Sequence, residues 1–86
     1  MKIDFHRDWE SWFKKLRPAQ KDLFYQRLEL FMQNPHDPSL NNHPLHGVLK
    51  DFRTINVGGD LRGLFRRTAE SYIFYRVGTH HQLYQK

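Results

Sequence analysis

Two adjacent glycines, Gly58 and Gly59, constrain the fold of this chain more than any other feature, because they lie between two segments of alternating polar and apolar residues. The alternation has the two-residue period of a half-buried β-strand. Consecutive glycines supply the positive φ angles that a tight hairpin turn requires. We therefore predict strands over residues 50–57 and 60–67 that pair as an antiparallel hairpin. In the first strand, one face would carry Phe52, Thr54 and Asn56, and the other Arg53, Ile55 and Val57.

A third alternating segment, residues 71–77, predicts another strand after a turn at 69–70. Gly78 ends the alternation, and Thr79 is a residue type that caps helices, so a short helix is expected to run to about Tyr84. Within the strand, one face would carry Ile73, Tyr75 and Val77, and the other Tyr72, Phe74 and Arg76.

The first part of the chain carries the patterns of one strand and two helices. Residues 2–6 alternate as a short strand, and Asp8 can then cap a helix. Pro18 is favoured in the first turn of a helix and disfavoured in its interior, so this helix would end near Arg17 and a second would run over 18–33. The apolar residues of the first helix recur at the spacing i, i+3, i+4, i+7 of one buried face, and they are Trp9, Trp12, Phe13 and Leu16.

These elements predict an α+β fold in which an N-terminal strand and a helical hairpin pack on a small, largely antiparallel β-sheet. The helical hairpin separates the N-terminal strand from the others, so its place in the sheet does not follow from the pattern. The 86 residues of the chain are enough for one small domain, spanning residues 1–86.

Composition narrows the environment and the partners. The chain has no cysteine, which excludes disulfides and thiolate zinc sites and fits a reducing cytoplasm. No apolar run approaches the length of a membrane helix, so we expect a soluble protein with no membrane partner. Lysine and arginine number 14 against 9 acidic residues, and the formal net charge is +5. This balance favours an anionic partner, either nucleic acid or an acidic protein segment.

Histidines flank the predicted strands at both ends, with His43 and His46 before them and His80 and His81 after them. Folding the strands back on one another can bring the two ends together. Pro44 biases His43 towards an extended backbone in a partly fixed loop. Imidazole suits proton transfer and metal binding. We expect no metal or other cofactor, because His43 and His46 lie in a constrained loop and the adjacent His80 and His81 point apart.

Several short motifs of the second half occur in one order. They are His43-Pro44-Leu45-His46-Gly47, Lys50-Asp51-Phe52-Arg53, Asp60 opening the second strand, and Arg76-Val77-Gly78-Thr79-His80-His81-Gln82-Leu83-Tyr84. In order and spacing, the chain resembles the RelE/ParE superfamily of bacterial toxins, and within it the YafQ-like branch. The resemblance covers the whole second half, and the strand-helix-helix start fits the layout of the superfamily.

This resemblance implies the toxin of a toxin–antitoxin pair, a ribosome-dependent endoribonuclease that cuts messenger RNA in the decoding site. The implied partners are a cognate antitoxin, the ribosome and messenger RNA, with operator DNA bound only through the antitoxin. Residue by residue, the implied catalytic positions are His43, Asp60, His80 and Tyr84. Arg76 precedes the Gly-Thr-His motif, and its position makes phosphate binding plausible.

RNA cleavage requires acidic, basic and cationic groups of this kind independently of the resemblance. Cleaving RNA without a metal needs a base for the 2′-hydroxyl, an acid for the departing 5′ oxygen, and a cation for the phosphoryl oxygens. His43 or Asp60 could be the base and His80 the acid, or the labels could be exchanged. Tyr84 could stack on a base or orient the sugar. The candidate RNA or phosphate contacts are Lys50, Arg53, Arg62, Arg66 and Arg76.

Two positions depart from the YafQ-like pattern, and they keep other functions open. Asn56 stands where the pattern has a second-strand histidine, and Leu61 stands where a tryptophan often follows the acid. Asparagine can position a hydrogen-bonded group but cannot transfer a proton near neutral pH. The alternatives are a non-nuclease, ParE-like toxin that targets DNA gyrase, and a degenerate toxin retained for antitoxin binding.

Overall fold

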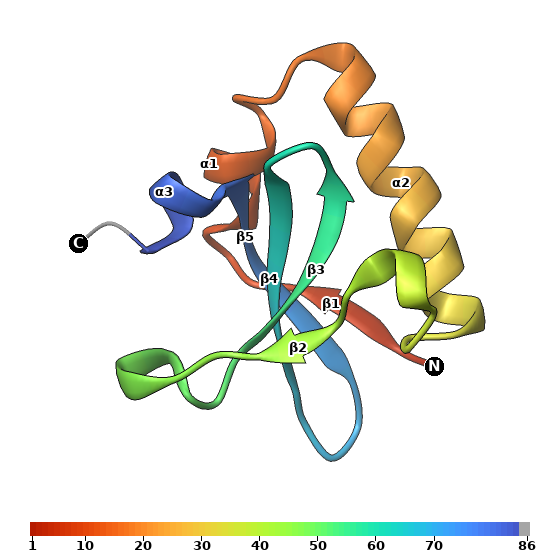
Figure 1. Ribbon diagram of the computed structural model, residues 1–86, viewed down its shortest axis with the longest axis vertical. Coiled ribbons are helices and arrows are strands. Elements are labelled where there is room, and N and C mark those ends of the chain that lie inside the picture. The colour runs from red at the N-terminus through yellow and green to blue at the C-terminus, as the bar shows by residue number, and fades with distance from the viewer. Residues whose placement is uncertain (85–86) are drawn as a thin grey trace.

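Two helices cover one face of a five-stranded sheet in the computed structural model, which describes residues 1–84 (Figure 1). A third, short helix follows the last strand. The strands are β1 (Ile3–Phe5), β2 (His43–Pro44), β3 (Arg53–Gly58), β4 (Leu61–Arg67) and β5 (Tyr72–Thr79). The helices are α1 (Trp9–Phe13), α2 (Pro18–Gln33) and α3 (His80–Tyr84), and two 3-10 turns are η1 (Pro38–Leu40) and η2 (Gly47–Leu49).

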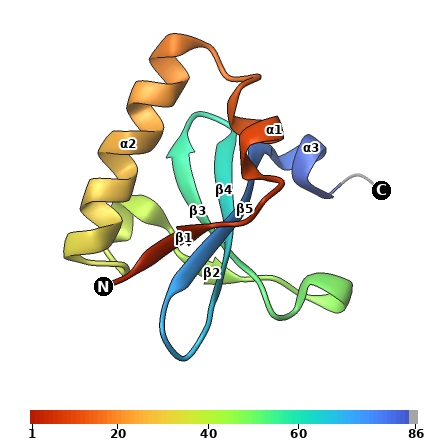
Figure 2. The same cartoon turned by 180° about the vertical axis from the view of Figure 1, so that it is seen from behind.

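The sheet order is β1-β5-β4-β3-β2, and the β1–β5 pair is the only parallel pair within residues 1–84. Figure 2 shows β1 lying along β5, and Ile3 pairs with Tyr72. The α+β class and the largely antiparallel sheet are therefore confirmed. The N-terminal strand, which the sequence pattern did not place, occupies the edge next to the last strand.

The helical hairpin follows the predicted break at Pro18. The second helix has the predicted bounds, and Gln20 Oε1 accepts a hydrogen bond from the backbone N–H of Arg17 at 2.9 Å. The first helix ends at Phe13, earlier than predicted. Leu16 continues the chain through a turn in which its N–H donates to the carbonyl of Phe13 at 3.0 Å. Asp8 occupies the predicted N-cap position, but its side chain makes no capping hydrogen bond.

The β3–β4 hairpin forms at the predicted glycines with two corrections. Of the two glycines Gly58 and Gly59, only Gly59 has a positive φ, of 54°. Gly58 is the last residue of β3, and a Cβ there would collide with the Leu23 side chain of α2. Asp60 lies in the turn and not at the opening of the strand, which begins at Leu61. The turn therefore has two residues, as predicted, but lies one position later, at Gly59 and Asp60. Likewise β3 begins at Arg53 and not at residue 50, because η2 and the turn after it occupy residues 47–51.

The predicted alternation of β5 is wrong at its centre because of a β-bulge. Leu64 of β4 pairs with Arg76, and the next residue of β4, Phe65, pairs with Phe74, so Tyr75 is the additional residue. A bulge shifts all following side chains to the opposite face. Phe74 and Val77 are consequently both buried in the core, where strict alternation would have separated them.

The core lies between the helical hairpin and the sheet, and it is built largely from aromatic rings. Phe31 contacts Phe65 and Phe74 with ring centroids 5.1 and 5.5 Å apart in edge-to-face geometry. Such pairs add about 0.5–1.5 kcal/mol beyond the area they bury. No helix within residues 1–84 is long and apolar enough to cross a membrane.

Candidate functional site

His43 lies on the edge strand β2 opposite Thr54 of β3, and not in a loop as predicted. Its Nδ1 is 2.7 Å from the backbone oxygen of Asn41, and its Nε2 is 3.4 Å from Oγ1 of Thr54. A carbonyl oxygen can only accept, so Nδ1 carries the proton of the neutral ring. Nε2 is then the basic nitrogen. The geometry prepares His43 to accept a proton at Nε2.

Asn41 presents its carbonyl to His43 from a left-handed backbone conformation, with φ of 46°. Asparagine tolerates this conformation better than most residues. Thr54 is fully buried, so the opposite side of the ring is held by a side chain that has little room to move. The orientation of the imidazole is therefore set by two neighbours on different elements.

His80 and Tyr84 lie one turn apart on α3 and contact each other edge to face. Their ring centroids are 4.4 Å apart, at an interplanar angle of 76°. The His80 side chain is exposed and Tyr84 is half-buried. This is the contact expected for side chains at i and i+4 of a helix. The structure thus brings together two of the four predicted catalytic residues.

The predicted cap of α3 is confirmed. The N–H of Gln82 donates to Oγ1 of Thr79 at 3.2 Å, and the N–H of Thr79 donates to Oε1 of Gln82 at 2.9 Å. These reciprocal bonds form a capping box, which satisfies two otherwise unpaired donors at the start of a helix. Leu83 is fully buried and anchors the other side of the helix.

Arg76 also positions α3. Its Nη1 donates to the carbonyl of Leu83 at 3.2 Å, and its guanidinium lies 5.5 Å from the ring centroid of Trp12. A cation at a helix C-terminus is favourable, as is one over an indole face. The side chain therefore connects α1 to the end of α3, and phosphate binding by Arg76 stays a prediction.

Asp60 and His80 lie at the same end of the sheet. Leu61 of β4 pairs with Thr79 of β5, and Asp60 immediately precedes that pair while His80 immediately follows it. Asp60 is exposed in its turn. The two residues therefore flank the last pair of β4 and β5, although β4 itself begins one residue later than predicted.

Arg53 is engaged in a structural contact. Its Nε donates to Oδ1 of Asn42 at 2.7 Å, and its Nη2 donates to the Asn42 carbonyl at 3.3 Å. Asn42 Nδ2 in turn donates to the carbonyl of Pro35 at 2.9 Å. This chain of bonds ties β3 to the segment that leads into His43.

Arg62 lies on the central strand β4, between Asn56 of β3 and Gly78 of β5. Its Nη1 donates to Oδ1 of Asn56 at 3.1 Å, while its Nε is buried without a hydrogen-bond partner among the described residues. Asn56, the position that departs from the YafQ-like pattern, therefore holds a cation.

The remaining predicted cations are exposed and lie apart from each other. Lys50 follows η2, and Arg66 lies near the far end of β4. The distance from Asp60 to Arg66 along the strand is roughly 20 Å at 3.3 Å per residue. Arg66 is thus too far from Asp60 to share one phosphate with it.

The two histidine-bearing ends of the predicted strands meet, as expected. They line a shallow cleft of about 300 Å³ formed by Leu45, His46, Val48, Leu49 and Tyr84. Sequence reasoning had not assigned a role to the aliphatic residues of this cleft. It also missed Thr54, whose contact with His43 depends on the β2–β3 register.

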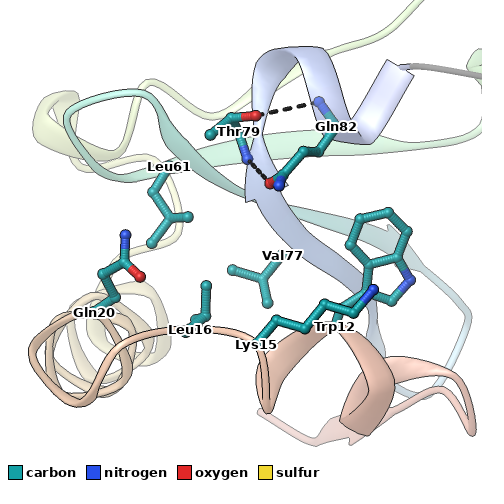
Figure 3. Close-up of a pocket in the computed structure, with 8 residues that line it drawn as sticks. All are labelled: Trp12, Lys15, Leu16, Gln20, Leu61, Val77, Thr79 and Gln82. Carbon is teal, nitrogen blue, oxygen red and sulfur yellow. Dashed lines mark hydrogen bonds between the residues drawn. The ribbon is translucent and has the colours of Figure 1, made fainter.

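A second cleft, of about 340 Å³, lies between the helical hairpin and α3 (Figure 3). Figure 3 shows Trp12 and Lys15 on its helical side and the capping pair Thr79 and Gln82 opposite. None of the predicted catalytic residues lines it, so we locate the candidate site at the other cleft. No three His, Asp or Glu side chains gather closely enough within residues 1–84 to hold a metal ion.

The chain shares its fold with solved toxins of the YafQ and YoeB/ParE types. The chain superposes on YafQ from E. coli strain BL21(DE3) with a TM-score of 0.81 and 22% identity, over 96% of this chain and 97% of that one. It superposes on the E. coli DinJ-YafQ toxin–antitoxin complex with a TM-score of 0.74 and 24% identity, over 96% of each chain.

A YoeB/ParE toxin from Agrobacterium tumefaciens has a TM-score of 0.75 and 10% identity, over 93% of this chain and 99% of that one. No family model matches the sequence, and neither does any curated protein. At these identities the likeness establishes the fold. The fold implied by the sequence resemblance to the YafQ-like branch is thereby confirmed.

Proposed function

We propose that this protein is the toxin of a toxin–antitoxin pair and that it cleaves messenger RNA on the ribosome by metal-independent acid–base chemistry. The observation that carries the proposal is the orientation of His43, whose Nδ1 is bonded to a carbonyl and whose Nε2 is left as the basic atom. The YafQ-type fold and the second histidine on α3 support it.

In the proposed reaction, Nε2 of His43 removes the proton of a 2′-hydroxyl, and the resulting oxygen attacks the adjacent phosphorus. The bond to the 5′ oxygen breaks, and protonated His80 donates a proton to that oxygen. The products are a 2′,3′-cyclic phosphate and a free 5′-hydroxyl. Tyr84 restrains the His80 ring through their edge-to-face contact, and Asp60, at the same end of the sheet, is the alternative base. Arg62, held by Asn56 on the central strand, is the cation proposed to offset phosphoryl charge.

The proposed partners follow from the fold and the charge. YafQ has been crystallised with the antitoxin DinJ, and a net charge of +5 favours an acidic antitoxin segment as well as RNA. In this proposal the free toxin acts on ribosomes and messenger RNA in the cytoplasm, and operator DNA is contacted only through the antitoxin.

The proposal is tested with a defined message in a purified translation system, with and without ribosomes. RNA ends are mapped for the wild type, His43→Ala, His80→Ala and the control His36→Ala, which changes an exposed histidine of the α2–η1 connector. We expect ribosome-dependent cuts from the wild type and the control, and their loss in the other two variants. An uncut message with folded wild-type protein would refute the nuclease proposal.

A second candidate function rests on Asn56. The amide of Asn56 accepts a bond from Arg62 and cannot transfer a proton, so the site has one acid–base group fewer than the YafQ-like pattern. A toxin that binds DNA gyrase without cleaving RNA is compatible with that loss. Inhibition of gyrase supercoiling by the wild type, together with an intact message, would select this function.

A further inference from the structure

The loop between β2 and β3 is closed on itself. The N–H of Leu45 donates to the carbonyl of Phe52 at 3.0 Å, the N–H of Phe52 donates to Leu49 at 2.9 Å, and the N–H of Lys50 donates to Gly47 at 3.2 Å. Gly47 has a φ of 67°, which favours glycine at this turn. Figures 1 and 2 show that the loop projects away from the sheet. It is therefore a preformed projection beside the candidate site.

Val48 stands at the tip of this projection and is 95% exposed. Single exposed apolar side chains are common and need no explanation. Val48 differs because it borders the cleft of about 300 Å³, whose other aliphatic residues are Leu45 and Leu49. The rings of His46 and Tyr84 complete the cleft. Its lining is thus apolar and aromatic, with no carboxylate among the described lining residues.

The cleft is linked to both proton-transfer groups of the proposed function through residues that line it. The bond from Leu45 to Phe52 continues the β2–β3 ladder by one pair, so Leu45 faces the same side of the sheet as His43, two residues earlier. On the other side, Tyr84 contacts His80. A ligand group in the cleft would therefore contact Tyr84, the neighbour of the proposed acid, and Leu45, which shares a sheet face with the proposed base.

We propose that this cleft binds one nucleobase of the message next to the scissile phosphate, an inference that rests on the proposed function. A nucleobase has two flat apolar faces, which Tyr84 or His46 can stack against and Val48 can cover. Lys50 follows the same loop and supplies a positive charge for the attached backbone. The net charge of +5 and the absence of acidic lining complement a polyanion.

Val48→Ser tests the proposal, because a side chain that is 95% exposed can be changed without disturbing the core. The control is Met32→Ser, which removes a 48% exposed apolar side chain from α2. Cleavage is measured at limiting message together with the bases found at mapped cut sites. Binding is measured to ribosomes that carry a message with a 2′-deoxy nucleotide at the scissile position, which cannot be cut.

We expect Val48→Ser to lower the cleavage rate and the affinity for the uncut message about tenfold, since a polar hydroxyl replaces the isopropyl group that covers one apolar face of the base. We also expect it to broaden the choice of base at the cut site, while Met32→Ser behaves as the wild type. Unchanged rate, affinity and cut sites in Val48→Ser would overturn the nucleobase proposal and leave the cleft to a protein partner. A wild type that neither binds nor cuts the message would instead overturn the proposed function itself.

Discussion

Thr54 places its Oγ1 3.4 Å from Nε2 of His43, on the strand that pairs with it. The contact is long for a hydrogen bond, and it faces the nitrogen that the proposed mechanism uses as the base. Thr54 is therefore a positioning residue for His43. It acts from a fully buried site in the sheet.

Replacing Thr54 with Val removes the hydroxyl and keeps the shape of the side chain. We expect the cleavage rate to fall about tenfold, corresponding to about 1.4 kcal/mol in the barrier, with little loss of stability. Thr54→Ser keeps the hydroxyl and should restore the rate. Single-turnover cleavage and thermal unfolding measure the two effects. Equal rates for the wild type and Thr54→Val would show that the hydroxyl does not position His43.

Phe31 should be the clearest test of the aromatic core. It is fully buried and contacts Phe65, Tyr72 and Phe74. Phe31→Ala should lower the free energy of unfolding by about 3–5 kcal/mol, through lost burial and the cavity left behind. Met32→Ala, at the exposed neighbour, should change it by no more than about 0.5 kcal/mol. Urea denaturation of both variants compares the values, and a similar small loss in both would contradict the described core.

Gln82 holds the start of α3 through the capping box with Thr79. Gln82→Ala should cost about 1 kcal/mol of local stability, because the Thr79 N–H loses its acceptor. The amide protons of Leu83 and Tyr84 should then exchange faster with solvent. Gln26→Ala, at an exposed position of α2, is the control and should leave their exchange unchanged. Unaltered exchange in Gln82→Ala would mean that buried Leu83 alone holds the helix.

Arg53 and Asn42 allow a structural role to be separated from RNA binding. Their two hydrogen bonds, of 2.7 and 3.3 Å, predict that the side-chain substitutions Arg53→Ala and Asn42→Ala each destabilise the protein, and that the double variant loses less than the sum. Chemical denaturation of the four proteins measures this coupling. Additive losses, with weaker RNA binding only in Arg53→Ala, would instead support the phosphate contact predicted from sequence.

Asp37 links stability to acid pH. Hydrogen bonds from the Ser39 hydroxyl and then from the Ser39 backbone N–H lower its pKa below the ordinary value of 3.8, and Arg27 adds a smaller attraction. A lowered pKa means that the stabilisation is complete above the unfolded value and is lost as the pH falls through the folded value. Asp37→Asn should therefore be less stable than the wild type at neutral pH, with a difference that shrinks below 3.8. Urea denaturation at a series of pH values measures it, and a difference independent of pH would exclude the charge as its cause.

Local signals predicted the helices and the hairpin well because each depends on neighbours in sequence. Pro18 marked the start of α2, and Thr79 marked the cap of α3. The bulge at Tyr75 was not predictable, because it depends on how β5 pairs with β4. The place of β1 likewise depends on packing between distant parts of the chain.

In the candidate site, too, contacts between residues close in sequence were predictable, and contacts between distant segments were not. His80 and Tyr84 are four residues apart on one helix, so their contact follows from the helical period. The partner of His43 does not follow from any local pattern, because the hydrogen bonds of the 45–52 loop set the register that puts Thr54 opposite it. The contacts of Arg53 with Asn42 and of Arg76 with Leu83 and Trp12 were also not predictable from the sequence, where both arginines were interpreted as cations available to bind phosphate.

The parallel pairing of β1 with β5 joins the first strand of the chain to the last. Folding must close a loop of nearly the whole chain before this pair forms, and domains dominated by such distant contacts fold slowly, on the order of milliseconds to seconds. On the ribosome, the segment that carries His43 emerges well before β5 and the helix that carries His80. Until β5 has left the ribosome, His43 and His80 therefore cannot come together. The two histidines can act jointly only after the last strand has been synthesised.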